Sequence, residues 1–431
     1  MPMYDLAVIG AGWAGFNAAL RAKESGFKVC LIECNKIGGT CLNQGCIPTK
    51  ALIACAKTYS LIKKSSGFGV ESDNPRFNFS KIQERKDSLV RVLTQGMQSR
   101  LSGIDFIESK AEIISAHEIK VKGRLISAKL MLISTGSRPV ELSQLKFDAA
   151  KIISSEGALS LTSLPRSLLI VGGGVIGCEF ASLFAALGVE VSMAEKMPLL
   201  LPGEDSEISR KIEVTFKKKG IKVYTNSDIS GLDLNIYEKI LVCVGREPVI
   251  SGLGLENLGI KLDKKAIAVD DFLRTSLTNI YAAGDCASKI MLAHYAAYQG
   301  VAAVENMISG NKNKADNPVV PACVFCDPEI SSVGLSEEKA RAAGFAVKVN
   351  KFDFRASAMA RIIEEYEGFI KVVSKQDTEE VIGGCIIGPK ATELIAILTM
   401  AVSLHLKVSQ IRAVIFAHPT LSESLRETFR N

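Results

Sequence analysis

Cys41 and Cys46 lie in the part of the chain richest in potentially reactive side chains, the stretch from Gly38 to Lys50. Four residues separate the two cysteines, so within about one helical turn their side chains can meet in a disulfide. A helix N-terminus and the ammonium group of Lys50 would lower the pKa of a thiol here and favour thiol–disulfide exchange. The alternatives are a chance pairing among eleven cysteines, or a metal site, for which no other Cys/His pair has matching spacing. The pattern favours a redox-active pair and predicts no metal.

A second candidate group lies near the C-terminus. Of the four histidines, only His418 has a proline beside it and a carboxylate, Glu423, close by in sequence. An imidazole takes and returns a thiol proton near neutral pH, which thiol–disulfide exchange requires. His418 is therefore the candidate acid–base residue. A packed, hydrogen-bonded histidine is the ordinary alternative, and it is the interpretation kept for His405 and His117.

Two glycine motifs predict the elements that position this chemistry. The apolar segment 6–9 predicts a buried strand that runs into a G-x-G-x-x-G turn and a helix, and the strand 29–32 ends at an acid. In such a unit the first glycine makes the turn, the second admits a pyrophosphate, the third lets helix and strand pack, and the acid accepts ribose hydroxyls. The first motif consists of Gly10, Gly12, Gly15 and Glu33, and the second of Gly172, Gly174, Gly177 and Glu195.

The identical spacing of the two motifs argues against a chance occurrence of either motif. Gly10 to Glu33 and Gly172 to Glu195 both span 23 positions, and the second set lies 162 positions after the first. Two dinucleotide sites are typical of an enzyme that passes electrons between two cofactors. Further apolar strands are expected to return to each unit. Two of them end in turns at Thr135–Gly136 and at Gly245, and a third ends at an acid, Asp285.

Residues 38–50, the paired glycine motifs and the segment 417–423 together resemble the pyridine nucleotide–disulfide oxidoreductase family. The resemblance covers nearly the whole chain. It implies an α/β fold with two Rossmann-like dinucleotide-binding domains, one for FAD and one for NAD, plus an α+β C-terminal dimerisation domain. The implied boundaries are 1–142 and 253–312 for the two parts of the FAD domain, 143–252 for a shortened NAD domain and 313–431 for the interface domain.

The resemblance also implies roles for individual residues. Cys41 would exchange with the substrate sulfur, and Cys46 would form the thiolate beside the flavin. Lys50 would lie near the flavin and pair with Glu179. His418, oriented by Glu423, would be the acid–base residue. The residues expected to bind cofactors are Gly10, Gly12, Gly15, Glu33, Lys50, Thr135, Gly136, Asp285 and Ala293 for FAD, and Gly172, Gly174, Gly177, Glu195 and Gly245 for NAD.

Within the family the resemblance is strongest to members that oxidise protein-bound dihydrolipoamide and pass electrons through the disulfide and FAD to NAD⁺. It implies a homodimer and, as partners, the lipoyl domains of 2-oxo acid dehydrogenase or glycine cleavage complexes. A glutathione-reductase-like enzyme is the alternative, but such enzymes usually have lysine where Thr49 stands, and Glu195 would repel a 2′-phosphate despite the adjacent Lys196. A silent binding subunit would be expected to lose the cysteines or His418.

Composition excludes several other classes. The 52 Lys and Arg residues against 46 Asp and Glu leave a formal charge of +6 spread along the chain, so no nucleic acid is predicted. The short cluster at 217–219 is expected to be a solvated helix end. The apolar stretch 394–406 is too short to span a bilayer and predicts a core or interface helix. No signal peptide is apparent, so a cytoplasmic enzyme is expected.

One segment departs from the family pattern. Residues 226–238 leave little room between the third strand of the second unit and the strand at 240, where relatives have about two extra strands. We expect a tight connection here, without the usual strand meander.

Overall fold

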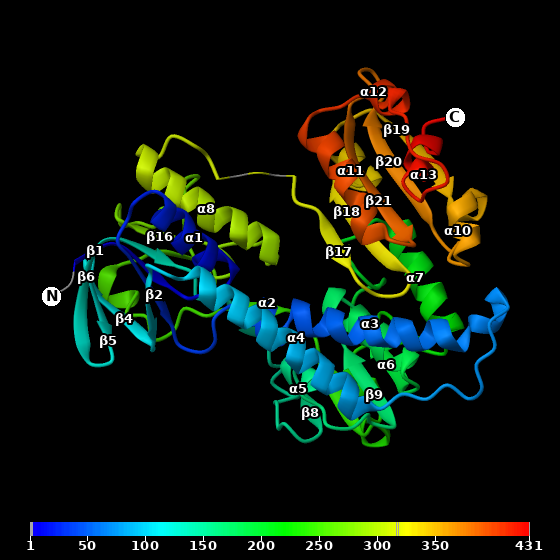
Figure 1. The fold of residues 1–431 in the computed structure, drawn as a ribbon, viewed down its shortest axis with the longest axis horizontal. Helices are drawn as coiled ribbons and strands as arrows, with labels where there is room; N and C mark the ends of the chain where they lie inside the picture. Colours follow the sequence, from blue (N-terminus) through cyan, green and yellow to red (C-terminus); the bar gives the residue numbers. More distant parts are fainter. Residues whose placement is uncertain (1–2, 316, 318, 431) are drawn as a thin grey trace.

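The computed structural model describes residues 3–315, 317 and 319–430. The three largest sheets divide the described residues into three bodies, which Figure 1 shows side by side. Two bodies are α/β units and the third is an antiparallel sheet with helices on it, so the predicted fold class is confirmed. The predicted domain boundaries stay a prediction, although each sheet falls inside the expected ranges.

The first sheet has the order β3-β2-β1-β6-β5-β4, and β16 pairs with β6. Its central strands are parallel and apolar on both faces, because helices cover one face and the β4–β5 hairpin with the segment 253–286 covers the other. Helices α1 and α8 lie together on one face, where α8 passes so close to α1 that only a glycine fits at Gly300. The strands are β1 (Met3–Ile9), β2 (Val29–Glu33), β3 (Asp105–Glu108), β4 (Ala111–Ser115), β5 (Glu118–Val121), β6 (Arg124–Ile133) and β16 (Ile280–Ala282), and the two helices are α1 (Trp13–Glu24) and α8 (Ala293–Ser309).

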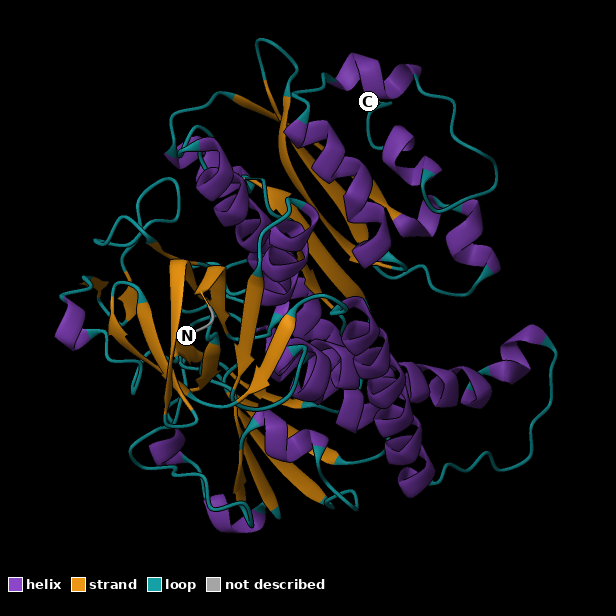
Figure 2. Ribbon diagram, turned by 60° about the vertical axis from the view of Figure 1, so that its left-hand side comes forward, coloured by secondary structure: helices purple, strands orange, loops and turns teal. Residues whose placement is uncertain are grey.

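Three further helices follow β2 and connect the first body to the second. They are α2 (Gly39–Gln44), α3 (Cys46–Lys63) and α4 (Phe79–Arg100). Helices α3 and α4 pack on each other and project together away from the first sheet, joined by a long loop (Figures 1 and 2). Helix α3 also packs on α6 (Val175–Ala186) of the second body, so the predicted thiol region lies at the junction of the two units.

The second sheet has the order β11-β10-β9-β12-β8, and all its pairings are parallel. Its elements are β8 (Ile152–Ile153), α5 (Ser155–Leu159), β9 (Ser167–Val171), α6 (Val175–Ala186), β10 (Glu190–Ala194), α7 (Ser206–Lys218), β11 (Lys222–Tyr224) and β12 (Lys239–Val242). Helix α7 ends within the lysine cluster: Lys217 pairs with Glu213 and Lys219 with Asp327.

The shortened segment of this unit has no strand between β11 and β12. It makes two single 3-10 turns, Ile229–Gly231 and Leu234–Ile236, each begun by an aspartate side chain that accepts a backbone N–H. Ile229 and Tyr237 are buried against Ile240 of the sheet. The predicted tight connection is therefore confirmed, and its own apolar side chains cover the sheet face.

The third body is an antiparallel sheet of order β17-β18-β21-β20-β19, on which α11 packs. Its elements are β17 (Ala322–Val324), β18 (Glu329–Gly334), α9 (Glu337–Ala342), β19 (Val347–Asp353), α10 (Ala358–Ile362), β20 (Phe369–Lys375), β21 (Val381–Gly388), α11 (Ala391–Ser403), α12 (Val408–Ala413) and α13 (Glu423–Glu427). Helix α11 buries one face and exposes Met400, as predicted for a core or interface helix. Among the described residues, none of the helices is both long and apolar enough to cross a membrane.

Candidate functional site

The two glycine turns have the same backbone geometry. Gly10 and Gly172 have φ angles of 105° and 108°, and a Cβ on either would overlap a carbonyl oxygen, that of Ser134 or of Cys243. Only glycine fits these two positions. A Cβ on Gly12 or Gly174 would meet open space, and neither glycine supplies a side-chain cap to the helix it precedes.

Open space at an uncapped helix N-terminus suits a negatively charged phosphate, because the first N–H groups of the helix have no other partner. The third glycines also match. A Cβ on Gly15 would overlap the Gly10 carbonyl oxygen, and a Cβ on Gly177 would overlap that of Gly172. Both turns therefore fit a dinucleotide pyrophosphate.

The two acids repeat the same contacts. Glu33 accepts N–H groups of Ala11 and Asn35 at 2.6 and 2.8 Å. Glu195 accepts those of Gly173 and Met197 at 2.6 and 2.7 Å. Each carboxylate oxygen takes one N–H and keeps a lone pair for a ribose hydroxyl.

The two cysteines lie in different helices. The sequence predicted that the two side chains meet, and they do, but across a break and not within one continuous helix: α2 ends before Gly45, whose φ and ψ are −145° and −111°, and α3 begins at Cys46. The break turns the two side chains toward each other, and the Cys41 thiol hydrogen-bonds to Cys46. The pair stands here as two thiols.

The two thiols differ strongly in acidity. The hydrogen bond from Cys41 lowers the pKa of Cys46 to about 7, and the charge of Lys50 adds to this against the effect of burial. The hydrogen bond to Cys46 and burial raise the pKa of Cys41 well above its usual value, with Trp13 and Lys50 opposing. Cys46 is therefore the sulfur that carries negative charge near neutral pH.

Lys50 and Glu179 form the predicted ion pair. The Lys50 ammonium donates to both Glu179 carboxylate oxygens at 2.8 Å, and it lies 4.7 Å from the ring centre of Phe325. Glu179 is buried and also accepts the Phe325 N–H at 3.0 Å. The Glu179 carboxylate, on α6, thus accepts hydrogen bonds both from α3 and from the residue that follows β17, close to the thiols.

The returning turns of the two units pair with each other. β7 (Ser137–Pro139) and β13 (Arg246–Pro248) form a two-stranded antiparallel ribbon. Gly136 and Gly245 precede these strands with left-handed φ angles, and the Thr135 hydroxyl donates to the Val249 carbonyl oxygen at 2.6 Å. The ribbon therefore links the turn at Gly136 in the first unit to the turn at Gly245 in the second.

Arg246 is a candidate site residue that the sequence reasoning missed. Its guanidinium donates to the Ser137 hydroxyl and carbonyl oxygens at 2.8 and 2.7 Å, and it lies 3.4 Å from the Thr40 hydroxyl beside the thiols. Ser137 in turn donates to Asp285 at 2.6 Å. The only signal in the sequence was an arginine directly after Gly245, and its neighbours come from distant segments.

The acid–base candidate lies elsewhere in this chain. His418 Nδ1 contacts the Glu423 carboxylate at 2.9 Å, as predicted, and the His418 side chain is 73% exposed. Figure 1 shows α13, which follows it, far from α2. A fold that brings together the thiols, Lys50 and Glu179 thus does not bring His418 to them within one chain. Ala293 is the first residue of α8. This helix packs on α1, the helix that follows the glycine turn of the first unit.

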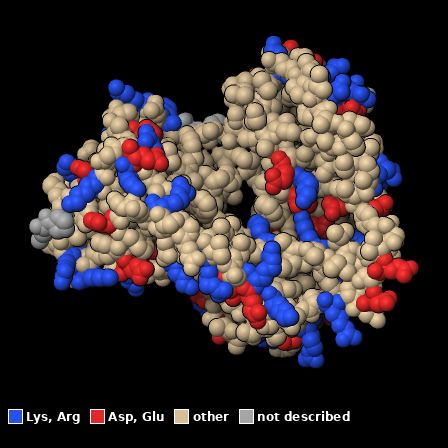
Figure 3. Space-filling model, in the orientation of Figure 1, with Lys and Arg blue, Asp and Glu red and all other residues tan. Residues whose placement is uncertain are grey.

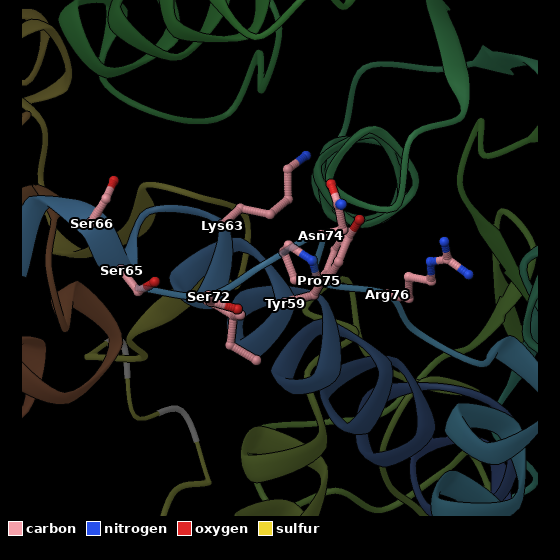
Figure 4. A pocket seen from close by; sticks show the side chains of 9 residues that line it. Tyr59, Lys63, Ser65, Ser66, Ser72, Asn74, Pro75 and Arg76 are labelled. Carbon is pink, nitrogen blue, oxygen red and sulfur yellow. The ribbon is translucent and has the colours of Figure 1, made fainter. Parts of the chain in front are cut away.

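One surface pocket is separate from all these residues. It has a volume of about 610 Å³ and lies at the tip of the α3–α4 projection, lined among others by Tyr59, Lys63 and Arg76 (Figure 4). It contains none of the predicted site residues. On the face in Figure 3, acidic and basic side chains are interspersed rather than gathered into a stripe of one sign.

The fold and this arrangement define a class of protein, and comparison with known proteins gives the same class. Residues 4–300 match the pyridine nucleotide-disulphide oxidoreductase family, and residues 320–429 match the dimerisation domain of that family. The chain belongs to this family, which binds FAD and NAD, so the predicted family and cofactors are confirmed.

Particular relatives narrow the comparison. The chain is 38% identical to the dihydrolipoyl dehydrogenase of Chlamydia pneumoniae over 97% of this chain and 95% of the relative. It is 36% identical to a dihydrolipoyl dehydrogenase of Bacillus subtilis over 98% of this chain and 97% of the relative. Among solved structures, LpdA from Mycobacterium tuberculosis is similar with a TM-score of 0.92, 29% identity and coverage of 100% and 99%.

Proposed function

We propose that the protein oxidises dihydrolipoyl groups and reduces NAD⁺, as a flavoprotein dihydrolipoyl dehydrogenase. The observation that carries this proposal is how the site is assembled. Two equivalent nucleotide-binding turns are joined by one ribbon, and between them lie two thiols, of which Cys46 has the lower pKa. The dihydrolipoyl dehydrogenases that match the chain over nearly its full length support the same activity.

The substrate carries two thiols and gives up two electrons. One substrate thiolate attacks the Cys41 sulfur of the oxidised pair, so that a substrate–Cys41 disulfide forms and Cys46 leaves as the thiolate. The second substrate thiolate then attacks the substrate sulfur of this mixed disulfide. The cyclic substrate disulfide forms, Cys41 leaves with its electron pair and takes up a proton, and the cysteine pair holds both electrons.

The residues around the pair serve this exchange. Lys50 and the hydrogen bond from Cys41 stabilise the Cys46 thiolate, so Cys46 is a good leaving group. Glu179 orients Lys50 toward the thiols. Bound FAD would supply the two-electron carrier between the cysteine pair and NAD⁺. Glu33, Asp285 and Arg246 are proposed to hold the flavin nucleotide, and Glu195 the ribose of NAD.

The proton acceptor is proposed to come from a second copy of the chain. His418 is exposed in the region that matches a dimerisation domain, and the neighbouring Ile415 is 94% exposed. A homodimer that covers this apolar side chain would bring His418 of the partner subunit to the thiols. Each site would then need both subunits.

Lipoyl domains of 2-oxo acid dehydrogenase or glycine cleavage complexes are the proposed partners, since they carry the dihydrolipoyl group on a mobile arm. We place the enzyme in the cytoplasm, because eleven cysteines without a regular framework fit a reducing compartment.

One assay separates this function from that of a glutathione reductase. NADH formation from dihydrolipoamide should be rapid, and glutathione disulfide reduction by NADPH should be at least 100-fold slower. Preference for glutathione disulfide would overturn the proposal.

The shared site is tested with mixed dimers of Cys41→Ser and His418→Gln subunits. If the residues act across subunits, each mixed dimer has one intact site and regains roughly half the activity. No recovery in flavin-loaded mixed dimers would refute the shared site.

A further inference from the structure

The only tryptophan of the chain lies at a special place, the first position of α1 directly after Gly12. The equivalent position of the second unit is Val175, the first residue of α6, which is 41% exposed. The two units therefore share their backbone turn and differ at the side chain that leaves it. Something specific to the first unit covers Trp13.

That cover is α2. The Gly38 N–H donates to the Ala11 carbonyl oxygen at 2.8 Å, and a Cβ on Gly39 would lie only 2.9 Å from the Gly12 Cα. The start of α2 is thus packed directly on the glycine turn. This contact places Cys41, in the first turn of α2, close enough to Trp13 for the indole to act on the pKa of its thiol.

The indole N–H has no partner among the described residues. Trp13 Nε1 is fully buried and has no acceptor in ordinary hydrogen-bond geometry there, while its side chain lies near enough to Cys41 to lower the pKa of that thiol. An indole nitrogen can only donate, and leaving a buried donor unpaired is destabilising. The indole favours the charged form of the Cys41 sulfur, opposing the rise in its pKa that the hydrogen bond to Cys46 and burial cause. A free donor therefore stands beside the sulfur that must leave with negative charge.

We propose that Trp13 donates its indole N–H to the Cys41 sulfur when that sulfur carries negative charge. This inference rests on the proposed function, and it concerns the second exchange step. There the substrate–Cys41 bond breaks, the substrate disulfide forms, and both electrons of the broken bond remain on Cys41 until a proton arrives. A buried N–H at this sulfur stabilises the leaving thiolate, as a donor aimed at developing charge does in other enzymes.

The experiment measures the Cys41 thiolate itself. In a Cys46→Ser background Cys41 is the only sulfur of the pair, and its alkylation by iodoacetamide is followed against pH by peptide mass spectrometry. Trp13→Phe keeps an aromatic ring and removes the donor. The alkylation pKa should rise by about one unit, which is roughly tenfold slower alkylation at a fixed pH below it. Val175→Ala, at the equivalent position of the second unit, should leave the alkylation profile unchanged.

Because the chain has one tryptophan, growth on 4-fluorotryptophan changes position 13 alone. This analogue keeps the N–H, so its alkylation profile should follow that of the Trp13 protein. With Cys46 present, Trp13→Phe should slow dihydrolipoamide oxidation roughly tenfold, while NADH oxidation by ferricyanide, which bypasses the thiols, stays within about twofold.

Two outcomes would overturn the inference. An unchanged Cys41 profile with loss of flavin would show that the indole serves FAD, and an unchanged profile with a lower melting temperature would show a packing role. Failure of the proposed function gives a different result: the Trp13 protein would not oxidise dihydrolipoamide, yet Trp13→Phe would still shift Cys41 alkylation.

Discussion

The two nucleotide units follow the same path through the glycine turn, the helix, the next strand and the acid, and they match even beyond the acid. Gly38 in the first unit and Leu201 in the second both adopt left-handed φ angles, and each donates its N–H at 2.8 Å to the carbonyl oxygen of Ala11 or Gly173. From there they diverge. The first unit enters α2 at once and places Cys41 on its own turn, whereas the second runs on to α7 at Ser206.

A second difference lies before the returning strand. The first unit has β4 and β5 there, which pair antiparallel with each other, and β5 also pairs antiparallel with the first residues of β6. The second unit replaces this meander with two short turns. The comparison shows that binding a dinucleotide depends on the repeated frame, while the thiol chemistry depends on a few residues added to one copy.

The largest expected effect comes from removing that addition. Cys41→Ser should lower dihydrolipoamide oxidation by at least about 10³-fold, because serine cannot form the mixed disulfide. The protein should stay yellow and keep NADH oxidation by ferricyanide, since neither glycine turn is altered. Steady-state assays and the flavin spectrum check both parts. A colourless Cys41→Ser protein would mean that the thiol helps to hold the flavin.

The next largest effect distinguishes the glycine turn of the second unit from that of the first. Alanine at Gly172 would adopt an unfavourable φ and overlap the Cys243 carbonyl oxygen, so Gly172→Ala should lower NAD-dependent turnover by roughly 100-fold and leave flavin bound. Gly10→Ala, the matched change, should instead cost the flavin. Flavin content per chain and the KM for NAD⁺ measure the difference. If both variants lose flavin alike, the two units are not independent.

A smaller effect concerns the coenzyme. Glu195 would repel a 2′-phosphate, so NAD⁺ should be favoured over NADP⁺, and Glu195→Gln should reduce this preference by roughly tenfold. Glu33→Gln, its counterpart in the first unit, should leave the preference unchanged. The ratio of kcat/KM values for the two coenzymes is the measurement. A wild-type ratio near one would remove the proposed role of Glu195.

The smallest effect is on stability alone. Tyr237 is buried against the second sheet where the meander is missing, so Tyr237→Ala should destabilise by about 2–4 kcal/mol. The adjacent Ile236 is exposed, and Ile236→Ala should change stability by less than about 0.5 kcal/mol. Denaturant unfolding of both variants tests whether the short connection supports the sheet. Equal stability of the two would show that it does not.

The sequence predicted the features that depend on local spacing. The turns at Gly10 and Gly172 follow from glycines that no other residue can replace, and the pairing of Lys50 with Glu179 followed from the family resemblance. The break at Gly45 was missed, because the spacing of the two cysteines does not show where one helix ends and the next begins. The position of Arg246 against Ser137 and Thr40 depends on tertiary contacts that no local pattern contains.

The histidines show a similar limit. His418 was selected because it has a proline beside it and a carboxylate five positions away. His405 was expected to be packed, which is wrong, since it is exposed and contacts Glu380 at 2.8 Å. A carboxylate partner therefore does not single out His418. What supports it is its place beside an exposed apolar segment in the dimerisation region, which only the fold displays.

The pairing of β16 with β6 has a consequence for the order of folding. Ile280 pairs with Met131, and the entire second unit lies between them in the chain. During synthesis the second unit is complete and can fold while the first still lacks its last strand and α8. Closing that long loop is a slow, non-local step. The body that carries the thiols is thus begun first and finished late, after its neighbour already provides a surface on which to close.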